Sequence, residues 1–178
     1  MVRKFRKRIS GLKTLKKLIY LVSPSKINKN FYNKLDKVLS YGNVAFFQLR
    51  LKKIKKNSLL KIAIKIRKIT NKYKVKFIIN DDYNLVLKTK ADGCHMGQLD
   101  GSIKFAKQKL KKKILGVTCH NSILLARKAV KNNADYLAFG SFFRSKLKPK
   151  AKKANFKILK QLKKDIKRPI VVIGGINN

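Results

Sequence analysis

The stretch Ala91-Asp92-Gly93-Cys94-His95-Met96-Gly97 (91–97) has the pattern of a short buried strand, and its opening pair returns later in the chain. Ala134-Asp135 stands six residues before Gly140, as Ala91-Asp92 stands six residues before Gly97. Each pair follows a helical stretch and opens a strand. Such self-similarity is typical of a barrel built from repeated strand–helix units.

On both sides of this stretch, short apolar segments alternate with amphipathic ones. The expected strands are 18–22, 44–52, 76–81, 93–97, 114–120, 136–143 and 169–176. The expected helices are 30–40, 57–74, 82–88, 102–110, 121–132 and 155–166. Strands that alternate with helices indicate a parallel sheet with helices outside it.

The number of strands distinguishes two architectures. A closed (β/α)₈ barrel needs eight strands, and seven precede Asn178. We therefore expect an α/β fold of the (β/α)₈ TIM-barrel type that lacks its last strand–helix unit, with an open doubly wound sheet as the alternative. The repeat and the polar residues at strand ends favour the barrel. The expected domain is 18–178, preceded by a basic N-terminal extension, 1–17.

The composition is strongly basic but is otherwise that of a folded protein. Of 178 residues, 47 are Lys or Arg and 7 are acidic, all of them Asp, so the formal net charge is +40, while 44% are hydrophobic. Because Lys is spread over nearly every polar position, the pattern indicates a bias in residue usage rather than a dedicated nucleic-acid surface. Any binding to polyanions should be non-specific and sensitive to salt.

The number of cysteines and the length of the apolar runs bear on the cellular location of the protein. Two cysteines give no disulfide framework, which favours a reducing compartment. No apolar run approaches the roughly 18–20 residues of a membrane span, and the run 18–22 is too short for the core of a signal peptide. We therefore expect a cytoplasmic location and no membrane partner.

Two of the few carboxylates follow expected strands directly. Asp81 ends Ile-Ile-Asn-Asp (78–81), and Asp100 ends His-Met-Gly-Gln-Leu-Asp (95–100). Such positions suit a divalent cation, because Mg²⁺ usually takes one or two carboxylates together with phosphate oxygens of a substrate. The alternative is that each Asp caps the helix that follows it. These two residues alone favour the capping interpretation.

The second expected strand carries an unusual polar face. Gln48, Arg50 and Lys52 alternate with apolar residues, so a strand through position 52 would put the three polar side chains on one face. In a barrel this face would point inward, near the mouth where sites are built. The alternative is a solvated edge strand, in which Lys discourages aggregation.

Polar groups recur at the ends of the other strands. They are Asn80-Asp81 after the third, Gln98 and Asp100 after the fourth, Thr118 and His120 at the fifth, and Gly174-Gly175 at the seventh. The sixth strand leads into a basic loop, 144–150, in which Ser145 and Lys148 offer donors for phosphate. Convergence at one end of successive strands is harder to explain by capping or solvation than any single residue is.

Both cysteines and both histidines occur as pairs, Cys94-His95 and Cys119-His120. Cys and His are common zinc ligands. However, neighbours in a strand point to opposite faces, so four such ligands cannot easily converge. We therefore expect a buried Cys beside a hydrogen-bonded His in each pair.

The residues at the strand ends match a known family. From about residue 18 to its end the chain resembles thiamine-phosphate synthase, a (β/α)₈ barrel. Five segments carry the resemblance, and their order and spacing are specific in combination: Gln48-Leu49-Arg50-Leu51-Lys52, Ile78-Ile79-Asn80-Asp81, 91–100, Gly116-Val117-Thr118-Cys119-His120 and Ile173-Gly174-Gly175-Ile176.

The resemblance implies an activity: joining hydroxymethylpyrimidine pyrophosphate to thiazole phosphate, with release of pyrophosphate and with Mg²⁺ as cofactor. It also implies roles for individual residues. Gln48 contacts the pyrimidine, Asn80 bridges pyrimidine and pyrophosphate, and Arg50, Lys52, Thr118 and Lys148 hold the pyrophosphate. Asp81 and Asp100 bind Mg²⁺, while Ser145 and Gly175 face the thiazole phosphate. No residue is implied as a general acid or base.

Two other functions are weighed against this one. A related thiazole tautomerase would use a His at the position of His120 for proton transfer, but it does not need the pyrophosphate cluster that this chain carries. A non-catalytic basic barrel would bind phosphorylated ligands or RNA. Binding of single strands needs exposed aromatic residues beside Lys and Arg, whereas most Phe residues here fall in expected strands and helix cores.

Overall fold

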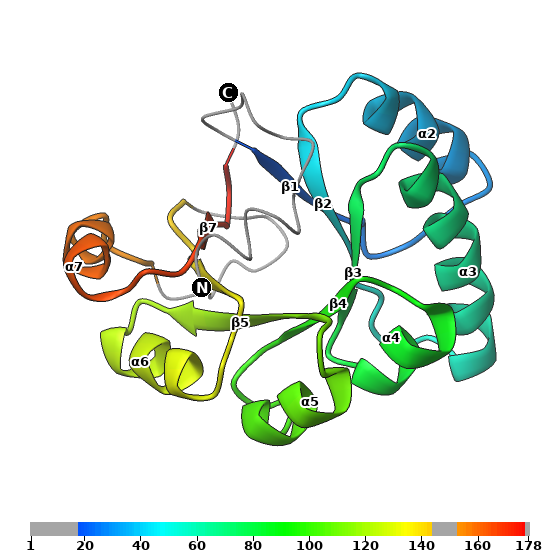
Figure 1. Cartoon of the computed structure of the whole chain (residues 1–178). Coiled ribbons are helices and arrows are strands. Elements are labelled where there is room, and N and C mark those ends of the chain that lie inside the picture. Colours follow the sequence, from blue (N-terminus) through cyan, green and yellow to red (C-terminus); the bar gives the residue numbers. More distant parts are fainter. Residues whose placement is uncertain (1–17, 144–152, 177–178) are drawn as a thin grey trace. The chain divides into compact units, whose positions relative to one another are not determined.

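The computed structural model describes residues 18–143 and 153–176, which divide into two compact units, 18–95 and 96–176. The seven predicted strands and the six predicted helices are all present in these residues (Figure 1). Their bounds differ from the predicted ones mainly at the ends of strands. The predicted extension, 1–17, lies outside the described residues.

The first unit contains four strands that pair in chain order, all parallel. Its helices α2, α3 and α4 lie on the same side of these strands (Figure 1). In the register, Phe47 stands opposite Leu21 on one side and Phe77 on the other. The elements are β1 (Ile19–Val22), α2 (Phe31–Ser40), β2 (Val44–Leu49), α3 (Lys56–Lys72), β3 (Lys76–Asn80), α4 (Tyr83–Thr89) and β4 (Gly93–Met96), whose last residue belongs to the second unit.

The second unit repeats the alternation with parallel strands β5, β6 and β7. Gly116 of β5 pairs with Tyr136 of β6, and a side chain at position 116 would overlap the ring of Tyr136, which is buried. Glycine is therefore needed here for a close approach. The elements are α5 (Ile103–Leu110), β5 (Ile114–His120), α6 (Ile123–Lys131), β6 (Tyr136–Phe139), α7 (Lys157–Asp165) and β7 (Ile170–Val172).

The core of the first unit forms between its strands and the helices beside them. Every residue of β2 is buried, as expected of a parallel strand covered on both faces. Helix α3 buries Ala63, Ile66 and Thr70, which follow one another at helical spacing. Thr70 is accommodated because its hydroxyl donates to the carbonyl of Arg67 at 3.1 Å.

The Ala-Asp repeat makes the same contact in each unit. In the first, the N–H of Asp92 donates to the carbonyl of Phe77 at 2.9 Å, and its Oδ2 accepts from the N–H of Phe77 at 2.9 Å. The same oxygen lies 2.5 Å from a guanidinium nitrogen of Arg67. Asp92 thus joins the start of β4 to the start of β3 and to helix α3.

Asp135 does this in the second unit. Its N–H donates to the carbonyl of Leu115 at 2.7 Å, and its Oδ2 accepts from the N–H of Leu115 at 2.8 Å. Lys107 of α5 lies 2.5 Å from that oxygen. The repeat seen in the sequence is therefore also a repeat of structure. In each unit, an Asp carboxylate at the amino ends of two neighbouring strands joins these strands to a basic residue of a helix.

Three strands end three or more residues earlier than predicted. β2 ends at Leu49 rather than at Lys52, β6 at Phe139 rather than at Phe143, and β7 at Val172 rather than at Ile176. After β2, the next N–H, that of Arg50, donates to a side-chain hydroxyl instead of a strand carbonyl. After β7, Gly174 and Gly175 have φ of +94° and +67°, which an extended strand excludes.

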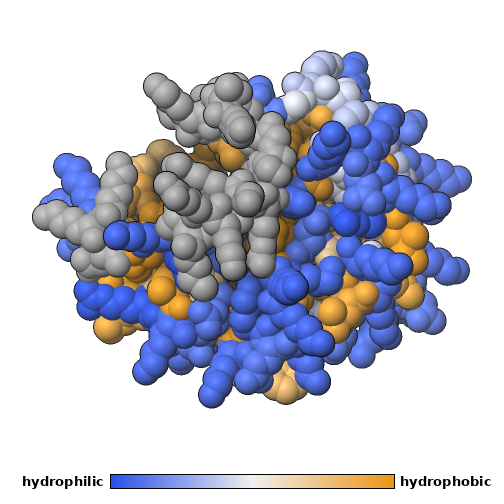
Figure 2. All heavy atoms as spheres, in the orientation of Figure 1, coloured by the Kyte–Doolittle hydropathy of each residue, from blue (hydrophilic) through white to orange (hydrophobic). Residues whose placement is uncertain are grey.

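The visible surface is largely hydrophilic, with apolar residues between the polar ones (Figure 2). Among the described residues, no helix is long and apolar enough to cross a membrane.

Candidate functional site

Gln48 and Asn80, which the sequence places at the ends of neighbouring strands, touch each other. The Nε2 of Gln48 donates to the Oδ1 of Asn80 at 2.6 Å. Gln48 is only 5% exposed although it is polar, and Asn80 is the last residue of β3. A buried amide needs a partner, so this bond explains how β2 carries Gln48 in its otherwise apolar sequence. It also fixes the two amide groups relative to each other.

The basic residues predicted beside them lie beyond the strand. Arg50 is half-buried and Lys52 is exposed, and both follow the last residue of β2. The prediction that a strand through position 52 aligns Gln48, Arg50 and Lys52 on one face is therefore wrong. Their spacing instead places one amide in the strand and two cations on the segment that leaves it.

Asp81 does not cap a helix. The cap of α4 is its neighbour Asp82, whose Oδ1 accepts from the N–H of Leu85 at 2.9 Å. Asp81 has φ of +64°, and its N–H donates to the carbonyl of His95 at 2.8 Å. Asp and Asn adopt this left-handed conformation more readily than other residues with side chains. The capping interpretation is therefore wrong for Asp81, which occupies a tight turn at the end of β3.

Asp100 does not cap a helix either. Ser102 caps α5, with its hydroxyl accepting from the N–H of Phe105 at 3.3 Å. The Oδ2 of Asp100 instead accepts from the N–H of Gly97 at 2.7 Å. A Cβ at position 97 would lie 2.7 Å from that oxygen, so glycine leaves the space that the carboxylate fills. The turn after β4 thus holds a half-buried carboxylate, against the capping interpretation for Asp100 as well.

Thr118 and Gln98 form a third contact of strand-end residues. The Nε2 of Gln98 donates to the backbone carbonyl of Thr118. Thr118 is half-buried in β5, and the pairing of β5 with β6 becomes irregular between Thr118 and His120. His120 is exposed with φ of +51°. The side chain of Gln98 therefore links the turn after β4 to the end of β5.

The last predicted positions lie around the loops after β6 and β7. The N–H of Phe143 donates to the carbonyl of Gly174 at 3.0 Å, and a side chain at position 174 would overlap Ser141. Gly175, predicted to face a phosphate, follows in the left-handed region. Ser145 and Lys148 lie outside the described residues.

The two cysteines are fully buried, as predicted, and His95 is only 6% exposed. Burial raises the pKa of Cys119 from 9.0 to about 12. A thiol with so high a pKa stays protonated near neutral pH and is a poor nucleophile and a poor metal ligand. Cys119 therefore belongs to the core.

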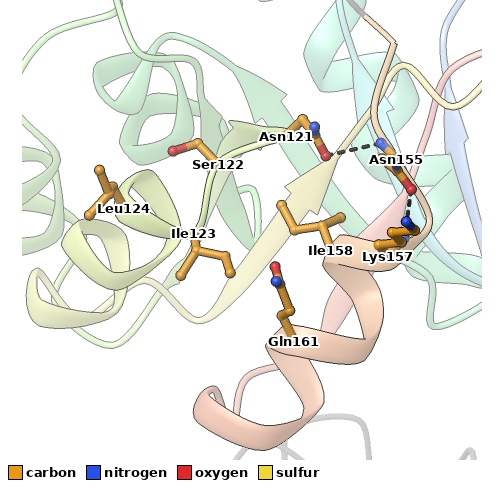
Figure 3. Close-up of a pocket in the computed structure, with 8 residues that line it drawn as sticks. All are labelled: Asn121, Ser122, Ile123, Leu124, Asn155, Lys157, Ile158 and Gln161. Carbon is orange, nitrogen blue, oxygen red and sulfur yellow. Dashed lines mark hydrogen bonds between the residues drawn. The ribbon is translucent and has the colours of Figure 1, made fainter.

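A cavity of about 390 Å³ in the second unit was not predicted from the sequence. It lies between the first turns of α6 and α7, where the Oδ1 of Asn121 accepts from the N–H of Asn155 at 3.0 Å (Figure 3). The N–H of Lys157 donates to the Oδ1 of Asn155 at 2.9 Å. The cavity is lined by Asn121, Ser122, Ile123, Leu124, Asn155, Lys157, Ile158 and Gln161, none of which is a predicted site residue.

Comparisons with known proteins bear on what these residues serve. The family model of thiamine monophosphate synthase matches residues 19–178. A thiamine-phosphate synthase from Pelagibacter ubique is 54% identical over 162 residues, which are 90% of this chain and 78% of that protein. One from Clostridioides difficile is 40% identical over 162 residues, 89% of this chain and 76% of that protein.

Solved structures agree with these matches. The thiamine phosphate pyrophosphorylase from Pyrococcus furiosus aligns with a TM-score of 0.79 at 29% identity, covering 90% of this chain and 76% of that one. The (S)-3-O-geranylgeranylglyceryl phosphate synthase from Thermoplasma acidophilum aligns with a TM-score of 0.64 at 14% identity, covering 99% of this chain and 81% of that one, which shows the fold alone.

Together these findings define the class of protein as an α/β enzyme of the TIM-barrel type, with polar residues after its strands. In this class, sites are built at the carboxyl ends of the strands. The chain belongs to the thiamine monophosphate synthase family, which makes it a transferase of thiamine biosynthesis.

Proposed function

We propose that this chain joins 4-amino-2-methyl-5-hydroxymethylpyrimidine pyrophosphate to thiazole phosphate with the strand-end residues described above. The bond between the pyrimidine methylene carbon and the pyrophosphate oxygen breaks, and its electron pair leaves with pyrophosphate. The thiazole nitrogen then gives its lone pair to the methylene carbon, which forms the new carbon–nitrogen bond. This path requires no protein acid or base, in keeping with the residues assigned.

The observation that carries the proposal is the hydrogen bond between Gln48 and Asn80. It uses one donor of the Gln48 amide and the oxygen of the Asn80 amide, and so leaves the Gln48 oxygen as an acceptor and the Asn80 nitrogen as a donor for a ligand. An aminopyrimidine offers both a donor and acceptors. We assign Gln48 to the pyrimidine, and Asn80 to the pyrimidine and the pyrophosphate.

Arg50 and Lys52 are assigned to the departing pyrophosphate. Cations placed where negative charge develops stabilise the transition state more than the ground state. Arg50 is half-buried, so its charge is screened less than that of a fully solvated side chain, whereas Lys52 is exposed. We assign Thr118 and Lys148 to the same group, although Lys148 lies outside the described residues.

Mg²⁺ is the proposed cofactor, with Asp81 and Asp100 as its protein ligands. The donor chemistry fits, because Mg²⁺ is usually held by one or two carboxylates together with substrate phosphates. Among the described residues, no group of three or more Asp, Glu, His or Cys could hold a metal ion, and Mg²⁺ commonly takes its remaining ligands from waters and substrate phosphates. When bound, the ion neutralises negative charge on the pyrophosphate. Asp82 and Ser102 cap α4 and α5, so the two proposed ligands are not needed as the caps of these helices.

The thiazole phosphate is assigned to the loops after β6 and β7, with Ser145 and Gly175 as its contacts. Gly175 and Gly174 have positive φ, and backbone N–H groups at such positions often bind anions. We further propose that the enzyme works in the cytoplasm, which agrees with its two buried cysteines, neither of which is in a disulfide.

The activity is tested by incubating the protein with both substrates and Mg²⁺ and measuring thiamine phosphate and pyrophosphate by chromatography. The two products should appear in equal amounts. Gln48→Ala should raise the KM for the pyrimidine substrate, while Gln161→Ala, in the cavity of Figure 3, should not. Wild-type protein that binds both substrates without forming either product would contradict the proposal.

A further inference from the structure

Ser23, the residue that follows β1, is in contact with the segment that carries Arg50 and Lys52. Its backbone N–H donates to the carbonyl of Gln48 at 2.9 Å. Its Oγ accepts from the backbone N–H of Arg50 at 2.9 Å. Ser23 is only 7% exposed, so this polar side chain is buried where it meets the end of β2. One residue thus holds the chain on both sides of Leu49.

The second bond replaces a strand bond. β1 and β2 are parallel, with Val22 opposite Gln48, and a regular parallel ladder would continue with backbone carbonyls as acceptors. At Arg50 the acceptor is a side-chain hydroxyl instead. Because the hydroxyl extends beyond the backbone, it can hold the N–H of Arg50 after the two chains cease to pair. Ser23 therefore sets the direction in which the segment 50–52 leaves the strand.

We infer that Ser23 is a positioning residue for Arg50, the first of the two cations proposed to bind pyrophosphate. The inference rests on the proposed function, in which Arg50 and Lys52 bind pyrophosphate. A guanidinium group binds phosphate through hydrogen bonds of defined direction, and its reach depends on where its own backbone is held. Ser23 acts on the ligand only through this backbone bond and is not a catalytic residue.

The size of the effect follows from what Ser23→Ala removes. The variant loses one acceptor and leaves the N–H of Arg50 without it, but it changes no charge. We expect the affinity for pyrophosphate in the presence of Mg²⁺ to fall by roughly three- to tenfold, the range of one neutral hydrogen bond. Ser23→Thr keeps the hydroxyl and should restore most of the affinity.

The test measures the Kd of inorganic pyrophosphate by calorimetry at fixed Mg²⁺ for the wild type and for Ser23→Ala and Ser23→Thr. Ser40→Ala is the matched control, because Ser40 is exposed and its hydroxyl donates to the carbonyl of Lys37, within α2. Thermal unfolding of each variant shows whether it is folded at the temperature of the titration. Ser23→Ala is also combined with Arg50→Ala.

If Ser23 acts through Arg50, the loss caused by Ser23→Ala should be clearly smaller in the Arg50→Ala background, because coupled residues are not additive. We also expect Ser23→Thr to recover most of the wild-type affinity for pyrophosphate, and Ser40→Ala to leave that affinity unchanged. A folded Ser23→Ala protein that binds pyrophosphate with wild-type affinity would overturn the inference about Ser23 and leave the proposed function standing. An equal loss of affinity on adding Ser23→Ala to the wild type and to Arg50→Ala would have the same consequence. Wild-type protein that does not bind pyrophosphate in the presence of Mg²⁺ would overturn both the inference about Ser23 and the proposed function.

Discussion

Asp81 and Asp82 are neighbours in the chain but have different structural roles. Asp82 caps α4 through the N–H of Leu85, whereas Asp81 holds a left-handed turn whose N–H donates to the carbonyl of His95. The helix does not need the Asp81 carboxylate as its cap. This division of roles makes it possible to change the proposed metal ligand without removing the cap, and the cap without removing the ligand.

The pair gives a direct comparison of function with stability. Asp81→Asn keeps a residue that tolerates positive φ and should change the free energy of unfolding little, while it removes Mg²⁺-dependent binding of pyrophosphate. Asp82→Ala removes the cap and should cost about 1 kcal/mol of stability, with pyrophosphate affinity retained. Urea denaturation and calorimetry measure the two quantities. Equal effects of both variants on affinity would contradict the division of roles.

Lys52 and Lys56 test whether the basic residues act at defined positions. Both are exposed, and Lys56 is the first residue of α3, four positions after Lys52. Lys52→Ala should weaken pyrophosphate binding by roughly ten- to a hundredfold, the range of a charge-assisted hydrogen bond. Lys56→Ala should have a much smaller effect that fades with added salt. Equal losses would show that diffuse positive charge alone binds the ligand.

Asp135 should matter for stability rather than for binding. Its carboxylate accepts from the N–H of Leu115 and lies against Lys107, with both charged side chains less than one-fifth exposed. Asp135→Ala should therefore lower the free energy of unfolding by roughly 1–3 kcal/mol. Asp36→Ala is the control, because Asp36 pairs with Lys72 at a more exposed site. This variant should therefore lower the free energy of unfolding much less. A urea midpoint for Asp135→Ala equal to that of the control would refute this role.

The buried thiol of Cys119 should make stability depend on pH in alkaline solution. Its pKa is about 12 in the folded protein, against an ordinary value of 9.0. Between these values the unfolded chain loses the proton and the folded protein keeps it, so stability should fall as pH rises, by at most about 1.4 kcal/mol per pH unit. Cys119→Ala should show a flatter decline above pH 9 in urea denaturation. Identical slopes in the two proteins would argue against this effect.

Much of the fold was predictable from the sequence because burial leaves a periodic pattern. Continuous apolar runs mark strands such as β3, and the helical spacing of apolar residues such as Ala63 and Ile66 marks the inner face of α3. Strand ends were predicted less well. The alternation of Gln48, Arg50 and Lys52 looks like a strand, but the hydroxyl of Ser23, 27 positions before Arg50, takes the place of the next ladder bond. A contact so distant in the sequence leaves no local signal.

The site shows the same limit. Candidate residues could be selected from their positions after strands, and two of them, Gln48 and Asn80, lie in contact. The capping roles were assigned to the wrong neighbours, because Asp81 and Asp82 both precede α4 and only backbone conformation distinguishes them. Similarly, the Ala-Asp repeat was visible in the sequence, but the partners Arg67 and Lys107 were not.

Calorimetric titration of the wild type with pyrophosphate, with and without Mg²⁺, tests the central claim most directly. Two carboxylates alone hold Mg²⁺ weakly, because the ion keeps waters at its remaining positions until phosphate oxygens of a substrate replace some of them. We predict tight binding of pyrophosphate only when Mg²⁺ is present, and loss of this dependence in Asp100→Asn, whose side-chain oxygen can still accept from the N–H of Gly97. A wild-type affinity for pyrophosphate that is the same with and without Mg²⁺ would contradict the account.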